Sequence, residues 1–464
     1  MTNTLQDAMF QQLKSKAIFE QAKSYAGAYT DGVMQRDVYP KDAAIEDLEQ
    51  FSEPMPAHRG DASDILSLLH KAGSPATLPT LGGRYFGFVT GSVIPVSLAA
   101  KWLSDVWDQN PAMYVLSPIS AKLESLCQDW LVDLFGLPKN TVAGFVSGSS
   151  MATFCGLAAA RYHLLKQAGW DVNTKGLNGA PKLRIIASRQ IHGTVIKAAA
   201  LLGLGVDSFE WVDMDSEGRM ITADMPKLDA RCIVIGQAGN VNSGAFEDFE
   251  IICKAARKAG AWVHVDGAFG LWAAATTRLK HLTKGMALAH SWSVDGHKTL
   301  NAPYDNGILL CAEPDAMVNA LQLAGDYIVH SPKRDGMLFT PEMSRRAHGT
   351  ELWAALKYLG KDGVDELVCG FHDRAVQMAD ELREAGFEII NEVVFNQVLV
   401  ACETDDITNQ TMANVQMSGE CWAGGSKWHG RQVIRISICS WATTKADITR
   451  SCRAFIDARA MANA

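Results

Sequence analysis

Short apolar runs recur through the middle of the chain and alternate with segments rich in small and polar residues. Segments between several of these runs, such as 149–169, 194–203 and 246–260, have the composition of helices. Apolar strands separated by helices are typical of a parallel or mixed sheet covered on both faces, so the pattern predicts an α/β fold. The runs that predict buried strands are 143–148, 183–188, 232–236, 261–266, 291–295 and 307–312.

The two ends of the chain have a different character. The N-terminal segment predicts polar helices with too little apolar surface to fold alone; its weak apolar face holds Leu5, Met9, Leu13 and Ile18. After residue 348, a long helix, two strand regions and a final helix predict a small α+β unit; they span 351–386, 388–402, 432–440 and 442–461. We therefore expect an N-terminal helical arm at 1–82, a large domain at 83–347 and a small C-terminal domain at 348–464.

Composition narrows the possible functions. The 464 residues include 43 Lys and Arg against 51 Asp and Glu, a net charge of −8, which argues against a nucleic-acid partner. No apolar stretch reaches the roughly 18 residues of a membrane span, and the first residues lack the apolar core of a secretory signal. The ten cysteines form no CxxC pair and no zinc-ligand spacing, so we expect no metal and reduced thiols in a cytoplasmic protein.

Two common nucleotide-binding motifs are absent. The chain has neither GxxxxGK[ST] nor GxGxxG, and the nearest candidate, Gly203-Leu-Gly205, lacks the third glycine. A nicotinamide-dependent dehydrogenase is therefore disfavoured.

An anion-binding turn is predicted where the strand at 143–148 runs directly into a helix. Ser149 and Ser150 stand at the helix start, where free backbone N–H groups and the positive end of the helix dipole suit a phosphate. The alternative is that one of the serines is only an N-cap.

Three titratable residues follow other predicted strands. Asp266 ends the run 261–266, at the edge of an α/β sheet where ligands bind, although it could simply cap a loop. Lys298 follows the run 291–295, where partial desolvation would free a nucleophilic amine, although a surface lysine is the alternative. His192 begins a helix after the run 183–188, where an isolated histidine is often only structural.

The order of these residues is more informative than any one of them. A phosphate seat, a flat ring, an anion for a ring nitrogen and an imine-forming lysine are the four requirements of pyridoxal 5'-phosphate. The sequence supplies them as Ser149 and Ser150, His192, Asp266 and Lys298.

From GGRYFGFV at 82–89 to its end, the sequence resembles the group II pyridoxal-phosphate-dependent decarboxylases, which include aromatic-amino-acid, glutamate and diaminobutyrate decarboxylases. The most specific stretches are HVDGAFGLWAA, WSVDGHKTLNAPYDNG, GQAGNVNSGAFED and QVIRISICSWATTKADI. The resemblance implies the fold type I architecture: a dimerising N-terminal arm, a large domain with a seven-stranded sheet and a small C-terminal domain. It also implies a homodimer with the active site at the interface.

The resemblance implies a role for each matching residue. Lys298 would be the Schiff-base lysine, Asp266 the partner of the pyridinium nitrogen, and His192 the histidine stacked on the ring. The phosphate-binding pair would be Ser149 and Ser150. The remaining residues assigned to the cofactor site are His297, Asn240 and Ala268.

Some positions depart from the family pattern. Gly239-Asn240-Val241 replaces a threonine-rich run, Thr299 replaces the usual tryptophan after the lysine, and Asp295 stands where some members have asparagine. None of these removes an essential function.

The segment from Tyr327 to Gly349 is a more serious departure. In aromatic decarboxylases the matching loop carries a tyrosine that returns a proton to the substrate carbon, whereas Phe339 lies near that place here. The donor could instead be His192, His330 or Tyr327. Loss of the tyrosine is associated in this family with aldehyde synthesis by oxidative deamination.

The same segment is rich in charge, and it predicts a mobile lid. We expect Gly336 to act as a hinge and trypsin to cut first near Lys333 or Arg334.

The sequence thus predicts decarboxylation of an L-amino acid to an amine and carbon dioxide. The alternatives are aldehyde synthesis, transamination or, least favoured, a non-enzymatic protein that kept the fold. The sequence does not identify the side chain of the substrate. Arg84 could face an acidic side chain, but a surface role is equally consistent with the sequence.

Overall fold

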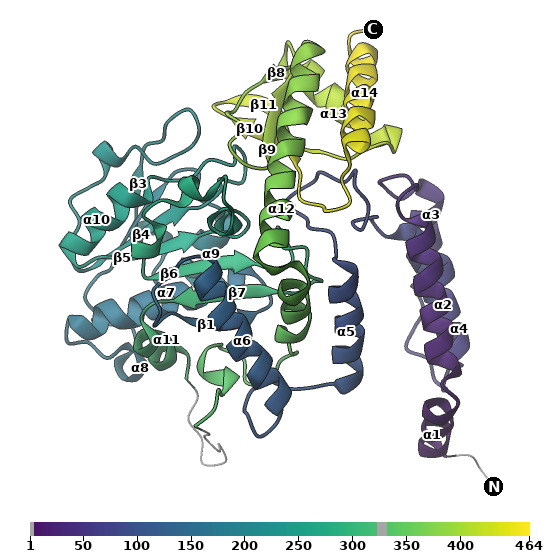
Figure 1. The fold of residues 1–464 in the computed structure, drawn as a ribbon, viewed down its shortest axis with the longest axis horizontal. Coiled ribbons are helices and arrows are strands. Elements are labelled where there is room, and N and C mark those ends of the chain that lie inside the picture. Colours follow the sequence, from purple (N-terminus) through teal and green to yellow (C-terminus); the bar gives the residue numbers. More distant parts are fainter. Residues whose placement is uncertain (1–3, 323–331) are drawn as a thin grey trace.

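The computed structural model describes residues 4–322 and 332–464, which form a large and a small sheet joined by helices (Figure 1). The large sheet has seven strands in the order β1-β7-β6-β5-β4-β2-β3. β2 to β6 pair in parallel, whereas β7 runs antiparallel to both β1 and β6. The strands are β1 (Val142–Val146), β2 (Arg184–Ser188), β3 (Phe209–Val212), β4 (Cys232–Gln237), β5 (Trp262–Asp266), β6 (Ser291–Asp295) and β7 (Gly307–Cys311).

Both faces of this sheet are buried, as the apolar runs predict. In β4, Ile233 and Ile235 face one core cluster and Val234 faces the other. The first cluster is covered by α7 (Ser149–Gln167), α9 (Gly193–Leu201) and α11 (Pro314–Leu321), and the second by α6 (Pro118–Leu134), α10 (Phe249–Ala259) and part of α12 (Gly349–Glu384). All six predicted strands are present, so the predicted α/β fold is confirmed.

The small residues of α7 let this helix lie close to the sheet. A Cβ atom on Gly156 would lie 2.7 Å from Cε1 of His264 on β5. This close approach holds the N-terminus of α7 at the edge where β1 ends, because the helix begins three residues after the strand.

The C-terminal part contains a four-stranded antiparallel sheet in the order β10-β11-β9-β8. Its elements are β8 (Glu388–Ile389), β9 (Gln397–Ala401), α13 (Asp405–Ser418), β10 (Gly424–Trp428), β11 (Arg431–Ser437) and α14 (Lys445–Ala462). The predicted strands and final helix are present, and α13 and β10 are additional.

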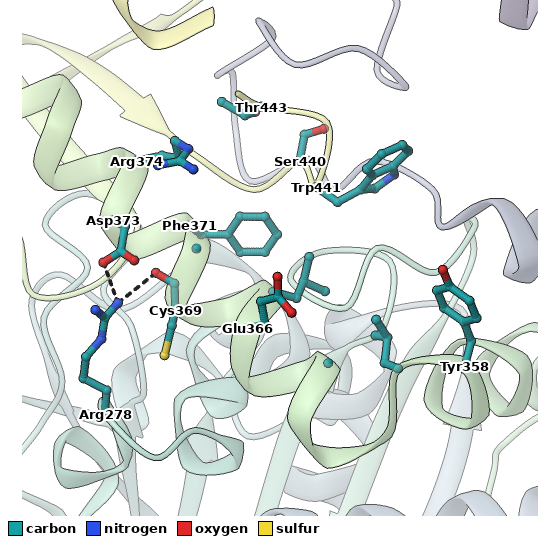
Figure 2. Close-up of a pocket in the computed structure, with 14 residues that line it drawn as sticks. Arg278, Tyr358, Glu366, Cys369, Phe371, Asp373, Arg374, Ser440, Trp441 and Thr443 are labelled. Carbon is teal, nitrogen blue, oxygen red and sulfur yellow. Dashed lines mark hydrogen bonds and ion pairs between the residues drawn. The ribbon is translucent and has the colours of Figure 1, made fainter. Parts of the chain in front are cut away.

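Helix α12 connects the two sheets and bends at Gly360, which has a left-handed backbone (φ +62°). Figure 2 shows the groove between its second half and the turn at 440–443, where Arg278 bridges Asp373 and the carbonyl of Cys369. None of the sequence-predicted site residues lines this groove, so it is not the candidate active site.

The N-terminal helices stand apart from the body of the protein (Figure 1). They are α1 (Leu5–Ser15), α2 (Ala17–Gly32), α3 (Asp42–Glu46) and α4 (Ala62–Leu68), and none of them contains a buried residue. The predicted apolar face is exposed: Leu5, Met9 and Leu13 are each more than half accessible. In addition, α5 (Pro95–Trp107) exposes Trp102, Leu103, Val106 and Trp107. These surfaces lack a cover from the described part of this chain.

All ten cysteines are free thiols. Within residues 4–322 and 332–464, no helix is both long and apolar enough to cross a membrane.

The predicted lid is wrong for the part of the loop from residue 332 to 349. The side chains of Arg334 and Arg345 are 7% and 5% exposed and pair with the buried carboxylate of Glu124 on α6, at 3.1 and 2.8 Å. Arg334 also lies over the ring of Phe339, 4.4 Å from its centroid. Arg346 pairs with Asp305 and Glu351, so charges that predict solvent exposure instead fix this segment to the body. Trypsin cleavage after Arg334 is therefore disfavoured.

The Glu124 pairs can be tested by removing the shared carboxylate. We expect Glu124→Gln to lower the free energy of unfolding by about 3–5 kcal/mol, because two buried guanidinium groups lose their counter-charge. The matched control is Asp133→Asn on the same helix. Its ion pair with Lys361 is largely exposed, so the loss should stay below about 1 kcal/mol. Urea denaturation checks both values, and equal losses would contradict the anchoring role.

Candidate active site

A pocket lies where β4, β5 and β6 end, at the carboxyl edge of the parallel part of the sheet. It also receives the N-terminus of α7 and the start of α9. Ligands of open α/β sheets bind at this edge because the loops after neighbouring strands converge there. The lining residues are Val89, Ser149, His192, Thr194, Gln237, Gly239, Val241, Asp266, Ala268, Phe269 and Lys298.

Asp266 ends β5 and is 7% exposed. Its Oδ1 accepts hydrogen bonds from the backbone N–H of Ala268 at 3.3 Å and from Oγ of Ser293 at 3.5 Å. Its backbone carbonyl accepts the N–H of Ala238 at 2.9 Å, which ties the ends of β4 and β5 together. The carboxylate is thus fixed at the pocket, and it can accept a further hydrogen bond from an N–H or O–H group of a ligand.

Lys298 lies three residues beyond β6, and its Nζ is 3.1 Å from Oδ2 of Asp295. The backbone at Lys298 is held by Asn301, whose Nδ2 donates to the Lys298 carbonyl at 2.8 Å. Gly91 packs against the same carbonyl so closely that a Cβ there would lie 2.2 Å away. These contacts present a half-buried amine to the pocket from a rigid loop.

His192 is the N-cap of α9. Its Nδ1 accepts the backbone N–H of Thr194 at 3.3 Å and lies 2.8 Å from the Thr194 hydroxyl. Desolvation at the pocket lowers the pKa of His192 more than the negative charge of Asp266 raises it, which favours the neutral ring even though the residue keeps part of its surface exposed. A neutral ring whose Nδ1 accepts a hydrogen bond carries its proton on Nε2.

Ser149 begins α7 and lines the pocket, and its backbone N–H donates to Oδ1 of Asp295 at 2.6 Å. Ser150 follows it on the exposed side of the helix and does not line the pocket. His297 lies behind Lys298, where its Nδ1 accepts the backbone N–H of Asn306 at 3.0 Å. Tyr304 stacks on the His297 ring with the centroids 4.3 Å apart.

The two remaining predicted cofactor residues differ in position. Ala268 lines the pocket beside Asp266. Asn240 is buried and shapes the adjoining loop, because its Oδ1 accepts the N–H groups of Asn242 and Ser243 at 2.9 and 3.3 Å. The loop thereby brings Val241, rather than Asn240, into the lining.

Sequence reasoning missed several residues of the site. Val89, Thr194, Gln237 and Phe269 line the pocket; three of them lie inside stretches that carry the family resemblance, but their apolar or neutral side chains did not single them out. Arg435 on β11 donates to the carbonyl of Val241 at 2.9 Å. A charged residue inside the apolar run VIRISI was the available signal for Arg435.

Two sequence-based interpretations of neighbouring residues are corrected. Arg84 is 4% exposed and pairs with Glu420 and Asp447, so it faces neither a substrate nor solvent. Phe339 packs on Arg334 and does not line the pocket. The alternative proton donors Tyr327 and His330 lie outside the described residues.

The residues present fit pyridoxal 5'-phosphate. An anion-binding helix start, a fixed carboxylate, a neutral histidine ring and a lysine amine all border one pocket. The Nε2 atom of Gln237, at the end of β4, is buried without a hydrogen-bond partner among the described residues, and a bound polar ligand would satisfy it.

Comparison with known proteins agrees with this geometry. A family model described as the pyridoxal-dependent decarboxylase conserved domain matches residues 84–402. The acidic amino acid decarboxylase GADL1 of Mus musculus is 25% identical over 368 residues, which are 76% of this chain and just under two thirds (66%) of that protein.

Solved structures share the fold over nearly the whole chain. The Oryza sativa TDC, crystallised with PLP and tryptamine, has a TM-score of 0.89 at 18% identity and covers 97% of this chain and 98% of its own. The Rhodiola rosea 4-hydroxyphenylacetaldehyde synthase has a TM-score of 0.84 at 21% identity and covers 98% of each chain.

The family domain extends from the segment before α5 to the end of β9 and so includes every strand of the large sheet. The chain therefore belongs to the pyridoxal-dependent decarboxylase family.

Proposed function

We propose that this protein converts an L-amino acid to the corresponding amine and carbon dioxide, with Lys298, Asp266 and His192 as its catalytic residues. One observation carries the proposal: the ends of β5 and β6 and the start of α9 bring these three side chains to the same pocket. The cofactor supplies an electron sink for the electrons left behind by the departing carboxylate.

Each residue has a role that follows from its chemistry. The N-terminus of α7, with Ser149 and Ser150, binds the phosphate through N–H and hydroxyl donors. Asp266 keeps a proton on the ring nitrogen, because a buried carboxylate favours a cationic partner. His192 covers one face of the ring, and the amine of Lys298 holds the cofactor between turnovers and releases the product.

Arg435 completes the site as the group that holds the substrate carboxylate. It adjoins the pocket through Val241, and burial lowers the pKa of its guanidinium from the ordinary value. Its positive charge is close enough to act on His192, and no carboxylate pairs with it among the described residues. A half-buried cation without an acidic partner among the described residues suits an anionic ligand group.

The proton returned to the substrate carbon comes from Nε2 of His192 in this proposal. The Nδ1 atom is engaged by Thr194, and the neutral ring leaves the Nε2 proton available to a group in the pocket.

Aldehyde synthesis is the second candidate. The observation in its favour is that no tyrosine lines the pocket within the described residues. In addition, a solved structure that shares the fold is that of an aldehyde synthase. Product analysis separates the two candidates: both release carbon dioxide, but the decarboxylase also releases the amine, whereas the other reaction consumes oxygen and water and yields aldehyde, ammonia and peroxide.

A second copy of the chain is the proposed cover for the exposed apolar surfaces of α1 and α5. Four large apolar side chains of α5 are each at least 45% exposed, with Val106 at 78%. Patches of this kind mark interfaces in proteins that are otherwise polar outside. Equilibrium sedimentation should give twice the 50.3 kDa chain mass, and a single species of 50.3 kDa would rule out the dimer.

The proposed function is tested first on Lys298. Purified protein loaded with pyridoxal 5'-phosphate should be yellow, and borohydride should fix the cofactor on the peptide that contains Lys298. The same preparation is then offered twenty amino acids, ornithine and diaminobutyrate, and carbon dioxide is measured. Lys284→Ala should give the same label and the same carbon dioxide release as the wild type, since this exposed lysine pairs with Glu250 and does not line the pocket. Label on another lysine, or no carbon dioxide from any amino acid, would refute the proposal.

Arg435 predicts a separate effect on substrate binding. We expect Arg435→Gln to raise KM about 10- to 100-fold, which corresponds to the loss of one charge-assisted hydrogen bond of about 1.5–3 kcal/mol. Borohydride labelling of Lys298 should persist. Arg431→Gln on the same strand is the control, because Arg431 is exposed and pairs with Glu388. An unchanged KM for Arg435→Gln would remove the assigned role.

A further inference from the structure

Asp295 is a second buried carboxylate at the active site, and the proposed mechanism does not use it. Its side chain is 1% exposed at the end of β6. It accepts the backbone N–H of Ser149 at 2.6 Å and lies 3.1 Å from Nζ of Lys298 and 3.6 Å from Nε2 of His297. Asp295 therefore links the start of α7 to the lysine loop.

The contact with Ser149 puts this carboxylate at the phosphate seat. The N-terminus of α7 offers free backbone N–H groups and the positive end of a 19-residue helix. Asp295 occupies the first of these donors, and Oδ1 would lie 3.7 Å from a Cβ on Gly148, the residue that precedes the helix. A phosphate dianion bound there would compete with a carboxylate for the same N–H group and would be repelled by its charge.

The charged groups around Asp295 do not neutralise both its carboxylate and a bound phosphate. The cation closest to the Asp295 carboxylate is Lys298, and the neighbouring histidines have pKa values lowered by burial. Asp266 adds a further negative charge across the pocket. The titratable groups that face Asp295 are Lys298, His297 and Tyr304 on its own loop, His192 from α9 and Asp266 from β5.

We propose that Asp295 takes up one proton from solvent when the cofactor phosphate binds at the start of α7, so that cofactor affinity in this protein depends on pH. The proton converts the carboxylate to a neutral acid, which removes the repulsion and can donate a hydrogen bond. This inference rests on the proposed role of Ser149 and Ser150 as the phosphate seat. Asparagine is the neutral isostere of the protonated acid, so Asp295→Asn should remove the pH dependence.

The experiment measures binding of pyridoxamine 5'-phosphate, which has no aldehyde and cannot condense with Lys298. Dissociation constants are determined from pH 7 to 9 for the wild-type chain and for Asp295→Asn. The ratio of the wild-type value to the variant value should rise with pH, by at most about tenfold for each pH unit. Comparison with the variant cancels the titration of the ligand itself. Asp315→Asn, an exposed position at the start of α11, should follow the wild type.

Two further measurements make the result decisive. Pyridoxamine without phosphate should give a ratio that does not change with pH. Calorimetry of the wild-type chain in buffers of different ionisation enthalpy should show proton uptake with the phosphorylated ligand only, a readout that needs no variant. A pH-independent ratio, or equal proton uptake with both ligands, would overturn the role of Asp295. If neither ligand binds, the phosphate seat itself is wrong and the inference falls with it.

Discussion

The structure depends on two buried carboxylates and one half-buried lysine at the ends of adjacent parallel strands. Asp266 ends β5, Asp295 ends β6, and Lys298 follows within the next turn. Charges in such a place are unfavourable unless they are paired or hydrogen-bonded. Backbone N–H groups from Ala268 and Ser149 and the amine of Lys298 provide these partners. The same contacts fix the positions of these side chains at the pocket.

The surrounding architecture keeps this arrangement rigid. Glycine and alanine on α7 allow the helix to pack closely on β5, so that its N-terminus meets the lysine loop. Asn301 joins the lysine loop to the segment after β11 through hydrogen bonds to the carbonyls of Lys298 and Cys439. The segment after β11 is thereby linked through Asn301 to the loop of Lys298, and β11 itself places Arg435 next to Val241.

Local sequence pattern predicts most of the large sheet, because its central strands are apolar on both faces. It misses β3, an edge strand in which Glu210 pairs with Arg184 at the surface. It also misses β10, where Gly424, Gly425 and Lys427 interrupt any apolar run. The residues proposed to hold the cofactor could be selected from the sequence because each follows a strand or begins a helix. Arg435 was not predicted, since its relation to Val241 is a contact between distant parts of the chain.

The charged segment after residue 332 shows the limit of local reasoning most clearly. Arg334, Arg345 and Arg346 predict a solvated loop when only their neighbours in sequence are considered. Their partners Glu124, Asp305 and Glu351 come from other elements, and these pairs anchor the segment to the body of the protein. Likewise, the sequence alone does not show that His192 and Lys298 lie close together. The fold brings both side chains to one pocket, and this makes their proposed roles testable.

The central claim is that Asp266 makes the cofactor an effective electron sink, and one variant tests it directly. Asp266→Ala should reduce kcat for carbon dioxide release by about 100-fold or more, as for other preorganised electrostatic partners. Borohydride should still fix the cofactor on Lys298 at full occupancy. A variant that retains near-normal kcat with full cofactor occupancy would contradict the account.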